Sequence, residues 1–306
     1  MQGTMGATAT SAGERDRRPA MTARQLQRPV GELLREWREH RRLSQLAFAI
    51  QAGVSTRHLS FVETGRSAPS REMVLHLAEQ LEVPLRERNH LLVAAGYAPA
   101  YAESAFDSPE MAVVRTAVRQ VLAGHEPYPA LAVDRHWTIV DANASISLFT
   151  EGAAPHLLAS PASCLRIGLH PDGLARRIVN LSEWRAHLLG RLRRQIARSA
   201  DPALVQIYDE LCAYPYERTE SEDDLLDSNA IVVPLRIRDV HHGGRELAFF
   251  STVTTFGTPL DITVEELAIE SFFPADAETA AALREGYAGS MGGKRRGHQE
   301  VWDTAG

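Results

Sequence analysis

Residues 55–61 place short polar side chains, an arginine and an aromatic ring along one face of an expected helix. The helix spans 56–64, and Ser55 caps its N-terminus. The outward-facing positions, which are the candidates for contact with base edges in DNA, are Ser55, Thr56, Arg57, Ser60 and Phe61. Arginine can donate two hydrogen bonds to O6 and N7 of guanine, and an apolar ring can pack on the methyl group of thymine. The segment therefore predicts a helix that contacts DNA bases through its N-terminal half.

Three further residues near this helix are candidates for contact with DNA phosphates. Gln45 begins an expected helix over 45–51, where its side-chain amide and the free backbone N–H groups can bind one phosphate together. Thr64 and Arg66 lie at and just past the end of the helix that carries the base contacts. Glu63 carries a charge that phosphate repels, so we expect it to stabilise the fold rather than to contact DNA.

The helix that carries Arg57 is expected to be the third of five in the first part of the chain. The expected helices are 30–40, 45–51, 56–64 and 70–81, followed by one that begins at Pro84 and stops at Gly96. In the second helix, Leu46, Ala47 and Ile50 are expected to form the inner face. Gly53 lies in the turn that follows and can adopt a positive φ there. Five short helices predict a compact all-α domain.

Residues 43–45, 52–55, 59–66 and 69–70 together resemble the Xre family of lambda-repressor-like helix-turn-helix proteins. In this motif a tight turn lets the second helix lie in the major groove while the first crosses the DNA backbone. The resemblance implies that Thr64 and Arg66 lie where the family contacts phosphates. A dimer is also expected, because one recognition helix contacts only a few base pairs.

Charge is distributed unevenly along the 306 residues. The first 96 residues contain 14 arginines and 10 acidic residues, whereas the remainder contains 19 basic and 29 acidic residues. A basic front part on an acidic body suits a domain that binds a polyanion. No apolar run reaches the ~18–20 residues that cross a bilayer, and Cys164 and Cys212 lie too far apart for a CxxC redox or zinc site. These features predict a cytoplasmic protein with no membrane contact and no bound metal.

The rest of the chain predicts a second domain of a different class. A linker over 97–109, rich in Ala, Ser and Pro, is expected to separate the helix-turn-helix domain, 28–96, from an α+β domain, 110–285. The expected strands are 130–133, 137–140, 231–237 and 247–254, and the expected helices are 110–124, 144–149, 173–199 and 202–213. We expect these helices on one side of an antiparallel sheet. Residues 1–27 and 286–306 are expected to be a disordered leader and tail.

Three kinds of function can follow a DNA-binding domain: catalysis, dimerisation or the binding of a small ligand. The sequence has no GxSxG, HExxH, Walker or dinucleotide-binding glycine pattern, so we expect no catalytic residues, no enzyme activity and no cofactor. Asp141, His170 and His187 are isolated polar residues rather than a catalytic set. A dimerisation module with a packed core and a ligand sensor both remain open.

The strand-turn-strand-helix pattern after residue 126 resembles the opening of a PAS domain. More specifically, the chain resembles the MmyB-like regulators, which join an Xre-like helix-turn-helix to a PAS-like ligand-binding domain. The segments that carry this resemblance are residues 126–131, 134–137, 169–174, 180–185 and 255–261. The resemblance covers about 28–285 and implies a pocket for a fatty acid or a similarly long apolar molecule, which is an effector rather than a cofactor.

Apolar residues for such a pocket are present on expected strands and on the helices that face them. They are Trp137, Phe149, Trp184, Leu188, Phe249, Val253 and Phe256. A ligand carboxylate also needs a cation, because an unpaired buried charge is costly, and Arg166 and Arg185 are the candidates. We therefore expect a dimeric transcription regulator that binds operator DNA and senses a lipophilic molecule. The alternative is a second domain that only dimerises and binds no ligand.

Overall fold

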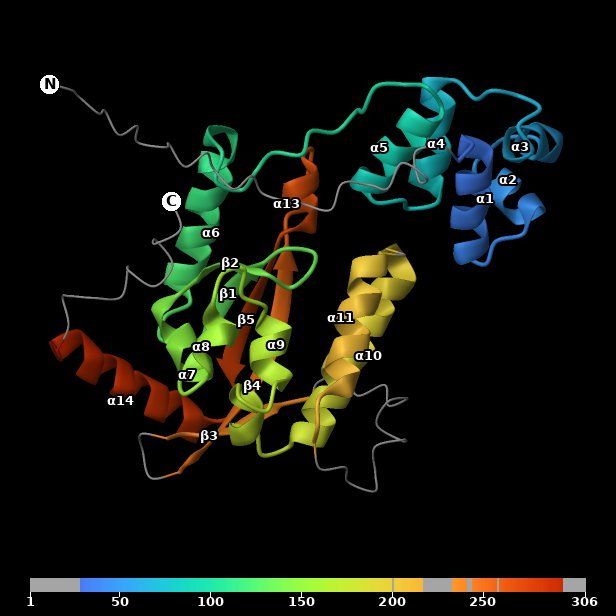
Figure 1. The fold of residues 1–306 in the computed structure, drawn as a ribbon. Helices are drawn as coiled ribbons and strands as arrows, with labels where there is room; N and C mark the ends of the chain where they lie inside the picture. The colour runs from blue at the N-terminus through green and yellow to red at the C-terminus, as the bar shows by residue number, and fades with distance from the viewer. Residues whose placement is uncertain (1–27, 200, 217–232, 241–243, 258, 294–306) are drawn as a thin grey trace, which may run out of the picture. The chain divides into compact units, whose positions relative to one another are not determined.

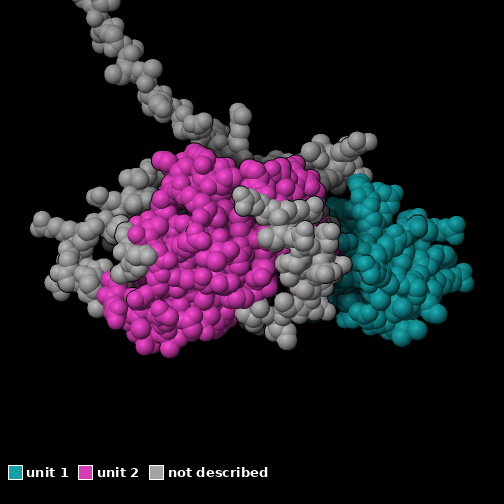
Figure 2. Space-filling model, turned by 90° about the horizontal axis from the view of Figure 1, so that it is seen from below, with its two compact units in different colours: residues 1–100 teal, residues 101–306 magenta. Residues whose placement is uncertain are grey.

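The computed structural model describes residues 28–199, 201–216, 233–240, 244–257 and 259–293. The chain divides into two compact units, Met1–Ala100 and Tyr101–Gly306, which have different colours in Figure 2. Each unit has a hydrophobic core of its own. The expected leader over 1–27 lies outside the described residues, as do residues 294–306 of the expected tail.

Five helices form the part of the first unit that the structure describes, residues 28–100, which confirms the expected all-α class (Figure 1). They are α1 (Val30–His40), α2 (Gln45–Gln51), α3 (Thr56–Glu63), α4 (Arg71–Gln80) and α5 (Leu85–Ala94). Three of them begin at a serine whose hydroxyl accepts a hydrogen bond from a backbone N–H of the first turn at 3.1 to 3.2 Å: Ser44, Ser55 and Ser70. Gly53 has a φ of +64° in the turn between α2 and α3, as its position predicted.

The inner face of α2 differs from the expected one. Phe48 and Ala49 are buried, whereas Leu46 and Ile50 are 59% and 72% exposed. Every residue from 46 to 50 is apolar, so periodicity cannot select a face in a helix of seven residues. The largest of these side chains, Phe48, occupies the interior.

Helices α1 and α3 approach each other closely at Gly31. A Cβ atom at this position would lie 2.2 Å from the carbonyl oxygen of Val62 and 2.8 Å from that of Glu63. The absence of a side chain therefore lets the end of α3 lie directly against the start of α1. This contact fixes the position of α3 within the unit.

A five-stranded antiparallel sheet forms the centre of the second unit (Figure 1). Its strands are β1 (Ala130–Val133), β2 (Ile139–Ala142), β3 (Leu235–Arg238), β4 (Glu246–Thr255) and β5 (Ala268–Pro274). They are arranged in the order β2-β1-β5-β4-β3, so the first and last strands are neighbours inside the sheet. This antiparallel sheet, with helices packed against it, confirms the expected α+β class.

The sequence did not predict β5, although it lies between β1 and β4. Glu270 and Ser271 interrupt its apolar residues, which removes the regular alternation that marks a strand. Both residues are buried, at 4% and 8% exposure. In the sheet, Glu270 pairs with Leu131 of β1 on one side and with Val253 of β4 on the other.

Helices cover both faces of the sheet, whereas the sequence predicted helices on one side only. Leu131 and Val133 of β1 belong to the larger core, and the alternating residues Ala130 and Ala132 belong to a smaller core beneath α6. All four residues of β1 are therefore buried. The helices that contribute to these two cores are α6 (Ala112–Gly124), α7 (Ser147–Thr150), α9 (Cys164–Leu169), α10 (Leu181–Ser199), α11 (Pro202–Ala213) and α14 (Ala277–Gly293).

The expected helix over 173–199 is interrupted. It consists of a short 3-10 helix, η3 (Leu174–Arg177), and of α10. Between them Ile178 pairs with Ile237 of β3, and the side chain of Asn180 accepts a hydrogen bond from the backbone N–H of Arg236 at 3.1 Å. These contacts with the sheet edge replace the helical hydrogen bonds at the break.

The ends of the second unit also differ from the expected bounds. From Tyr101 the expected linker belongs to this unit, where the backbone N–H of Ser104 donates to Asp261 at 3.1 Å. Helix α14 continues to Gly293, past the expected start of a disordered tail at 286, although glycines, which disfavour helix, make up half of its last eight residues. The remaining short helices are η1 (Pro109–Met111), η2 (Ala144–Ile146), α8 (Pro155–Leu158) and α13 (Ile262–Glu266). Within the described ranges, no helix has the length and apolarity needed to cross a bilayer.

Candidate DNA-binding face and ligand-binding core

Helix α3 presents the residues that the sequence predicted for base contact. Ser55, Thr56 and Arg57 are exposed at its N-terminus, and Ser60 and Phe61 are half-buried one turn later. The opposite face of the helix is buried in the core of the first unit. The polar N-terminal half of α3 is thus available to a partner molecule.

Two arginines flank the ring of Phe61. The guanidinium carbon of Arg57 lies 5.3 Å from the ring centroid, and that of Arg66 lies 5.9 Å from it. A contact of this kind stabilises an exposed arginine over the ring by about 0.5–1 kcal/mol and so orients its guanidinium. Neither arginine forms an ion pair with any residue that the structure describes. Both positive charges therefore remain available to an anion such as a DNA phosphate.

Gln45 and Thr64, the other predicted phosphate contacts, form side-chain hydrogen bonds within the first unit. Nε2 of Gln45 donates to Oε2 of Glu63 at 2.9 Å, and the hydroxyl of Thr64 donates to the carbonyl oxygen of Ser60 at 2.7 Å. An amide nitrogen carries two N–H donors, so Gln45 keeps one for a phosphate.

A buried ion pair holds α3 against α1. Nε and Nη2 of Arg38 donate to the two carboxylate oxygens of Glu63 at 2.7 and 3.0 Å, and the side chains are only 9% and 2% exposed. Nη1 of Arg38 also donates to the carbonyl oxygen of Leu43 at 2.8 Å. Glu63 therefore stabilises the fold, as the sequence predicted, and its pairing sets the position of the helix that carries Arg57.

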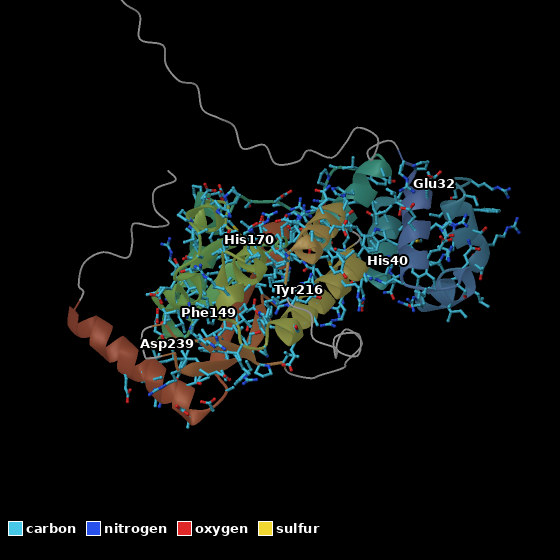
Figure 3. All side chains as sticks on the ribbon, turned by 60° about the horizontal axis from the view of Figure 1, so that its bottom comes forward. Glu32, His40, Phe149, His170, Tyr216 and Asp239 are labelled. Carbon is cyan, nitrogen blue, oxygen red and sulfur yellow. The ribbon has the colours of Figure 1, made fainter. Side chains whose placement is uncertain are left out.

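The largest core of the second unit brings together five of the seven apolar residues that the sequence predicted for a ligand pocket. They are Trp137, Phe149, Trp184, Leu188 and Phe249, all of them buried. The ring of Phe149, labelled in Figure 3, meets the rings of Phe249 and Phe272 edge-on, with centroids 5.4 and 4.7 Å apart. This core lies between the sheet and the helices α7, α9, α10 and α11.

Val253 and Phe256 lie outside this core. Strand β3 pairs with β4 only as far as Phe249, so the later part of β4 is an edge and Val253 is 45% exposed. Phe256 follows β4 and packs, half-buried, against the smaller core beneath α6.

The two arginines that the sequence predicted for a ligand carboxylate both have partners within the second unit. Nε and Nη2 of Arg166 each lie 2.8 Å from a carboxylate oxygen of Glu210. Nη2 of Arg185 donates to the carbonyl oxygens of Leu211 and Cys212, at 3.1 and 2.9 Å, near the end of α11. A cation at a helix C-terminus interacts favourably with the helix dipole, so Arg185 stabilises α11.

Two protein-family models match the chain. The model of the MmyB-like transcription regulator ligand binding domain matches residues 114–285, which is more than half of the chain. The chain belongs to the MmyB-like transcription regulators. The model of a helix-turn-helix domain matches residues 29–91 of this MmyB-like regulator. The first unit therefore carries a DNA-binding domain, and the second carries a domain for a small-molecule effector.

Comparison with individual proteins adds little to this assignment. The solved structure of an RsLOV variant is similar to the MmyB-like regulator at 13% identity, covering 58% of this chain and 79% of that one, with a TM-score of 0.26. At this score the likeness carries no conclusion about fold or ligand. No curated protein matches the sequence.

The sequence did not predict a partly buried ion pair in the second unit of the MmyB-like regulator. Nη1 and Nη2 of Arg191 donate to the carboxylate of Glu270 at 2.8 and 3.1 Å, and the guanidinium lies 4.1 Å from the centroid of the Trp137 ring. The sequence did indicate where Arg191 would lie. Arg191 follows Trp184 and Leu188 at helical spacing, with intervals of four and then three residues, and so lies on the same face of α10. The partner on β5 could not be found in this way.

Arg57 and Arg66 are expected to affect DNA binding by the MmyB-like regulator in different ways. Arg57→Ala is expected to weaken binding to the specific site by about 1–3 kcal/mol and to relax the preference at one base pair. Arg66→Ala is expected to weaken specific and non-specific binding alike and to reduce the salt slope by about one. Fluorescence anisotropy at several salt concentrations measures both effects. An unchanged base preference in Arg57→Ala would place the base contact elsewhere.

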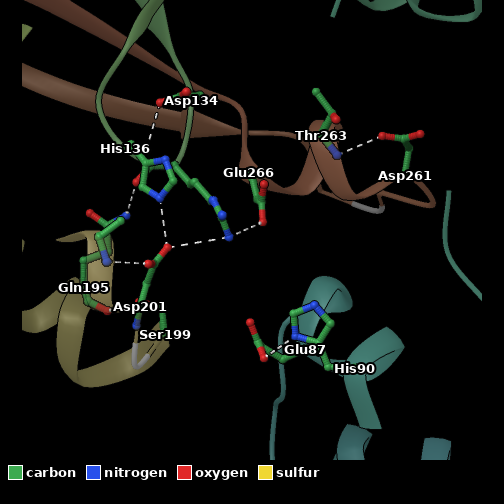
Figure 4. Close-up of polar contacts among 12 residues, drawn as sticks. Glu87, His90, Asp134, His136, Gln195, Ser199, Asp201, Asp261, Thr263 and Glu266 are labelled. Atoms are coloured by element: carbon green, nitrogen blue, oxygen red, sulfur yellow. Dashed lines mark hydrogen bonds and ion pairs between the residues drawn. The ribbon is translucent and has the colours of Figure 1, made fainter. Parts of the chain in front are cut away.

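A polar network joins the β1–β2 hairpin to the corner between α10 and α11 (Figure 4). Nε2 of His136 lies 3.0 Å from Oδ2 of Asp201, and Nη1 of Arg135 lies 3.6 Å from the same oxygen. Nε2 of Gln195 donates to the carbonyl oxygen of Arg135 at 2.8 Å, while its Oε1 accepts from Nε1 of Trp137 at 2.8 Å. The network thus connects the half-buried carboxylate of Asp201 with the ring of Trp137 in the core.

Asp201 is expected to contribute to stability at neutral pH and to lose that contribution in acid. Burial raises the pKa of Asp201, but hydrogen bonds from His136 and the backbone N–H of Ala203, with the charge of Arg135, lower it to about 2. A carboxyl whose pKa falls on folding stabilises the folded state above its unfolded pKa of about 3.9, and protonation near pH 2 removes this stabilisation. Asp201→Asn is therefore expected to cost about 1–3 kcal/mol at neutral pH and much less near pH 2. Urea unfolding at both pH values tests this, with the exposed Asp172→Asn as control. An equal loss of unfolding free energy in Asp201→Asn at the two pH values would contradict this expectation.

Proposed function

We propose that this MmyB-like regulator is a cytoplasmic homodimer that binds an operator through α3 and binds a lipophilic molecule, such as a long-chain fatty acid, in its second unit. Two features that occur together in one chain support the proposal. Arg57 and Arg66 offer charges with no ion-pair partner among the described residues at the helix-turn-helix. A ligand-binding family covers the domain whose core collects Trp137, Trp184 and Phe249.

The DNA-binding part of the proposal uses the geometry of α3. The helix enters the major groove with its exposed N-terminus, Arg57 donates to a base edge, and Arg66 contacts a phosphate on the adjoining backbone. One such helix contacts only a few base pairs, so two copies on adjacent half-sites give the specificity that a regulator needs. Members of the Xre family, which the first unit resembles, bind DNA in this way.

The ligand-binding part of the proposal uses the apolar core of the second unit. Burial of an acyl chain stabilises a complex by about 0.8 kcal/mol for each methylene group. A ligand that lies in this core must separate aromatic rings such as those of Phe149 and Phe249, which touch in the structure. The ligand then favours one arrangement of the second unit over another. It can alter DNA binding only to the extent that its affinity differs between the two arrangements.

Native mass spectrometry of the full-length protein tests the proposal. We expect dimers that retain an apolar ligand after purification or that take up long-chain fatty acids when these are added. Affinity is expected to rise with chain length until the available core is filled. Dimers that remain free of ligand at every chain length would contradict the sensor and favour a second unit that only dimerises. Monomers on operator DNA would contradict the proposed dimer.

A further inference from the structure

Only two arginines are more than nine-tenths buried within the part of the chain that the structure describes. They are Arg38, at 8% exposure in the first unit, and Arg177, at 6% in the second. Arg38 has the carboxylate of Glu63 as a bidentate partner. Arg177, at the end of η3, has no such partner among the described residues and donates only to backbone carbonyls. The guanidinium of Arg38 thus contacts a carboxylate, whereas that of Arg177 contacts only backbone carbonyl oxygens among the described residues.

The guanidinium of Arg177 lies between three segments of the second unit. Nε donates to the carbonyl oxygen of Arg238 at 3.0 Å, and Nη1 donates to that of Leu148 at 2.7 Å. Nη2 is buried and has no hydrogen-bond partner among the described atoms. A buried N–H without an acceptor destabilises the fold, and a charged one does so more strongly. A charged donor is therefore held in place by the fold while one of its nitrogens lacks an acceptor.

Two carboxylates act on the charge of Arg177, although neither accepts a hydrogen bond from its Nη2. Burial lowers the pKa of Arg177 and outweighs the carboxylates of Glu151 and Asp239, which raise it, while Arg176 lowers it further. Asp239 is itself 4% exposed. An anion in contact with Nη2 would supply the acceptor that this buried, charged donor lacks.

The apolar core adjoins this guanidinium. Leu148, whose carbonyl accepts from Arg177, directly precedes Phe149 on α7, and Ile178 directly follows Arg177. The side chains of all three apolar residues belong to the same core as Trp184 and Leu188. Phe149 and Asp239 are labelled at the same end of the second unit in Figure 3. A buried cation therefore lies beside the hydrophobic side chains that the proposed ligand would contact.

We propose that Arg177 anchors the acid group of the ligand of the second unit. Nη2 of Arg177 donates to the carboxylate of a long-chain lipophilic acid, and the chain of that acid lies among Phe149, Phe249 and the core residues of α10. The class of ligand is thus an amphipathic monocarboxylic acid rather than an ester or an alcohol of the same length. This assignment rests on the proposed ligand-binding function and selects Arg177 in place of Arg166 and Arg185. Arg166 pairs with Glu210. Arg185, whose Nε also lacks an acceptor, is less deeply buried than Arg177 and donates to carbonyl oxygens near the end of α11.

Displacement of a fluorescent fatty acid from the full-length protein tests the anchor. Long-chain acids and their methyl esters are titrated against the wild type, Arg177→Met and the matched control Arg176→Met, whose arginine is the exposed neighbour on η3. The wild type and Arg176→Met are expected to prefer the acid by about ten- to a hundredfold. Arg177→Met is expected to lose this preference and to keep the rise in affinity with chain length.

Each outcome of this titration has a defined meaning. An acid preference that survives in Arg177→Met, or equal binding of acids and esters by the wild type, would overturn the anchor and leave the proposed ligand site intact. No binding of either class by the wild type would overturn the ligand function and the anchor together.

The loss of two backbone contacts can prevent Arg177→Met from folding, so a measurement on the wild type accompanies it. The pKa of the bound acid is followed by nuclear magnetic resonance of its labelled carboxyl carbon. We expect this pKa to lie below that of the free acid, because a buried guanidinium stabilises the carboxylate. A bound pKa equal to or above that of the free acid would overturn the anchor without any variant.

Discussion

Replacement of Glu63 by alanine is expected to destabilise the DNA-binding unit by about 3–5 kcal/mol. The change leaves the guanidinium of Arg38 buried at 8% exposure without its bidentate carboxylate partner, and the loss of such a partner is costly because the remaining charge is not hydrated. The same change also removes the acceptor of Nε2 of Gln45. Hydrogen exchange followed by mass spectrometry measures the free energy of opening for each unit separately.

Glu39→Ala is the matched control for this experiment. Glu39 pairs with Arg35 on the same helix, and both side chains are more than half exposed. Its carboxylate also lies 3.6 Å from Nη2 of Arg38, so the control removes an exposed contact of the same arginine. Exposed pairs of this kind contribute less than about 1 kcal/mol. We therefore expect Glu39→Ala to change the opening free energy of the first unit only slightly. Equal effects of the two substitutions would show that Arg38 is hydrated and that its pairing does not position α3.

Replacement of Phe249 by alanine is expected to destabilise the second unit by a similar amount, about 3–5 kcal/mol. Phe249 has no exposed surface and its ring meets that of Phe149 edge-on at 5.4 Å. Truncation loses the transfer free energy of the ring and leaves a cavity that the close-packed core fills only in part. Hydrogen exchange is expected to report lower protection in the sheet and in α10, while the first unit keeps its protection.

Phe250→Ala is the control for the second experiment, because Phe250 is the next residue on β4 and points to the opposite face of the sheet. It is only half-buried and stacks on Phe273 with centroids 5.3 Å apart. A smaller loss of protection is expected. If Phe249→Ala reduced protection in both units to the same extent, the two units would unfold together and the division at residues 100 and 101 would have no thermodynamic meaning.

The helices of the first unit could be predicted because their signals are local. Ser44, Ser55 and Ser70 mark helix starts within a few residues of the groups that they cap. The prediction was wrong for the inner face of α2, where five consecutive apolar residues give no period. In that helix the tertiary contacts of Phe48 decide which side is buried.

The features that the sequence could not predict in the second unit depend on residues far apart in the chain. Glu270 is buried on β5 because Arg191, 79 residues away, pairs with it. Arg177 is buried because Leu148 and Arg238, which lie 29 and 61 residues away, supply carbonyl acceptors. The sequence offered Arg166 and Arg185 as candidates for a ligand carboxylate, but the neighbours of a residue in the sequence do not determine the partners of its side chain. Whether a charged side chain is buried depends on tertiary contacts with residues far away in the sequence.

A titration of operator DNA decides whether a ligand in the second unit controls the first. The operator is selected from random DNA with the purified protein, and its affinity is measured by anisotropy with and without a saturating long-chain fatty acid. The ligand is expected to change operator affinity by about five- to 150-fold, and the operator is expected to change the affinity for the ligand by the same factor. A fatty acid that binds tightly but leaves operator affinity unchanged would contradict the proposal that this regulator senses it.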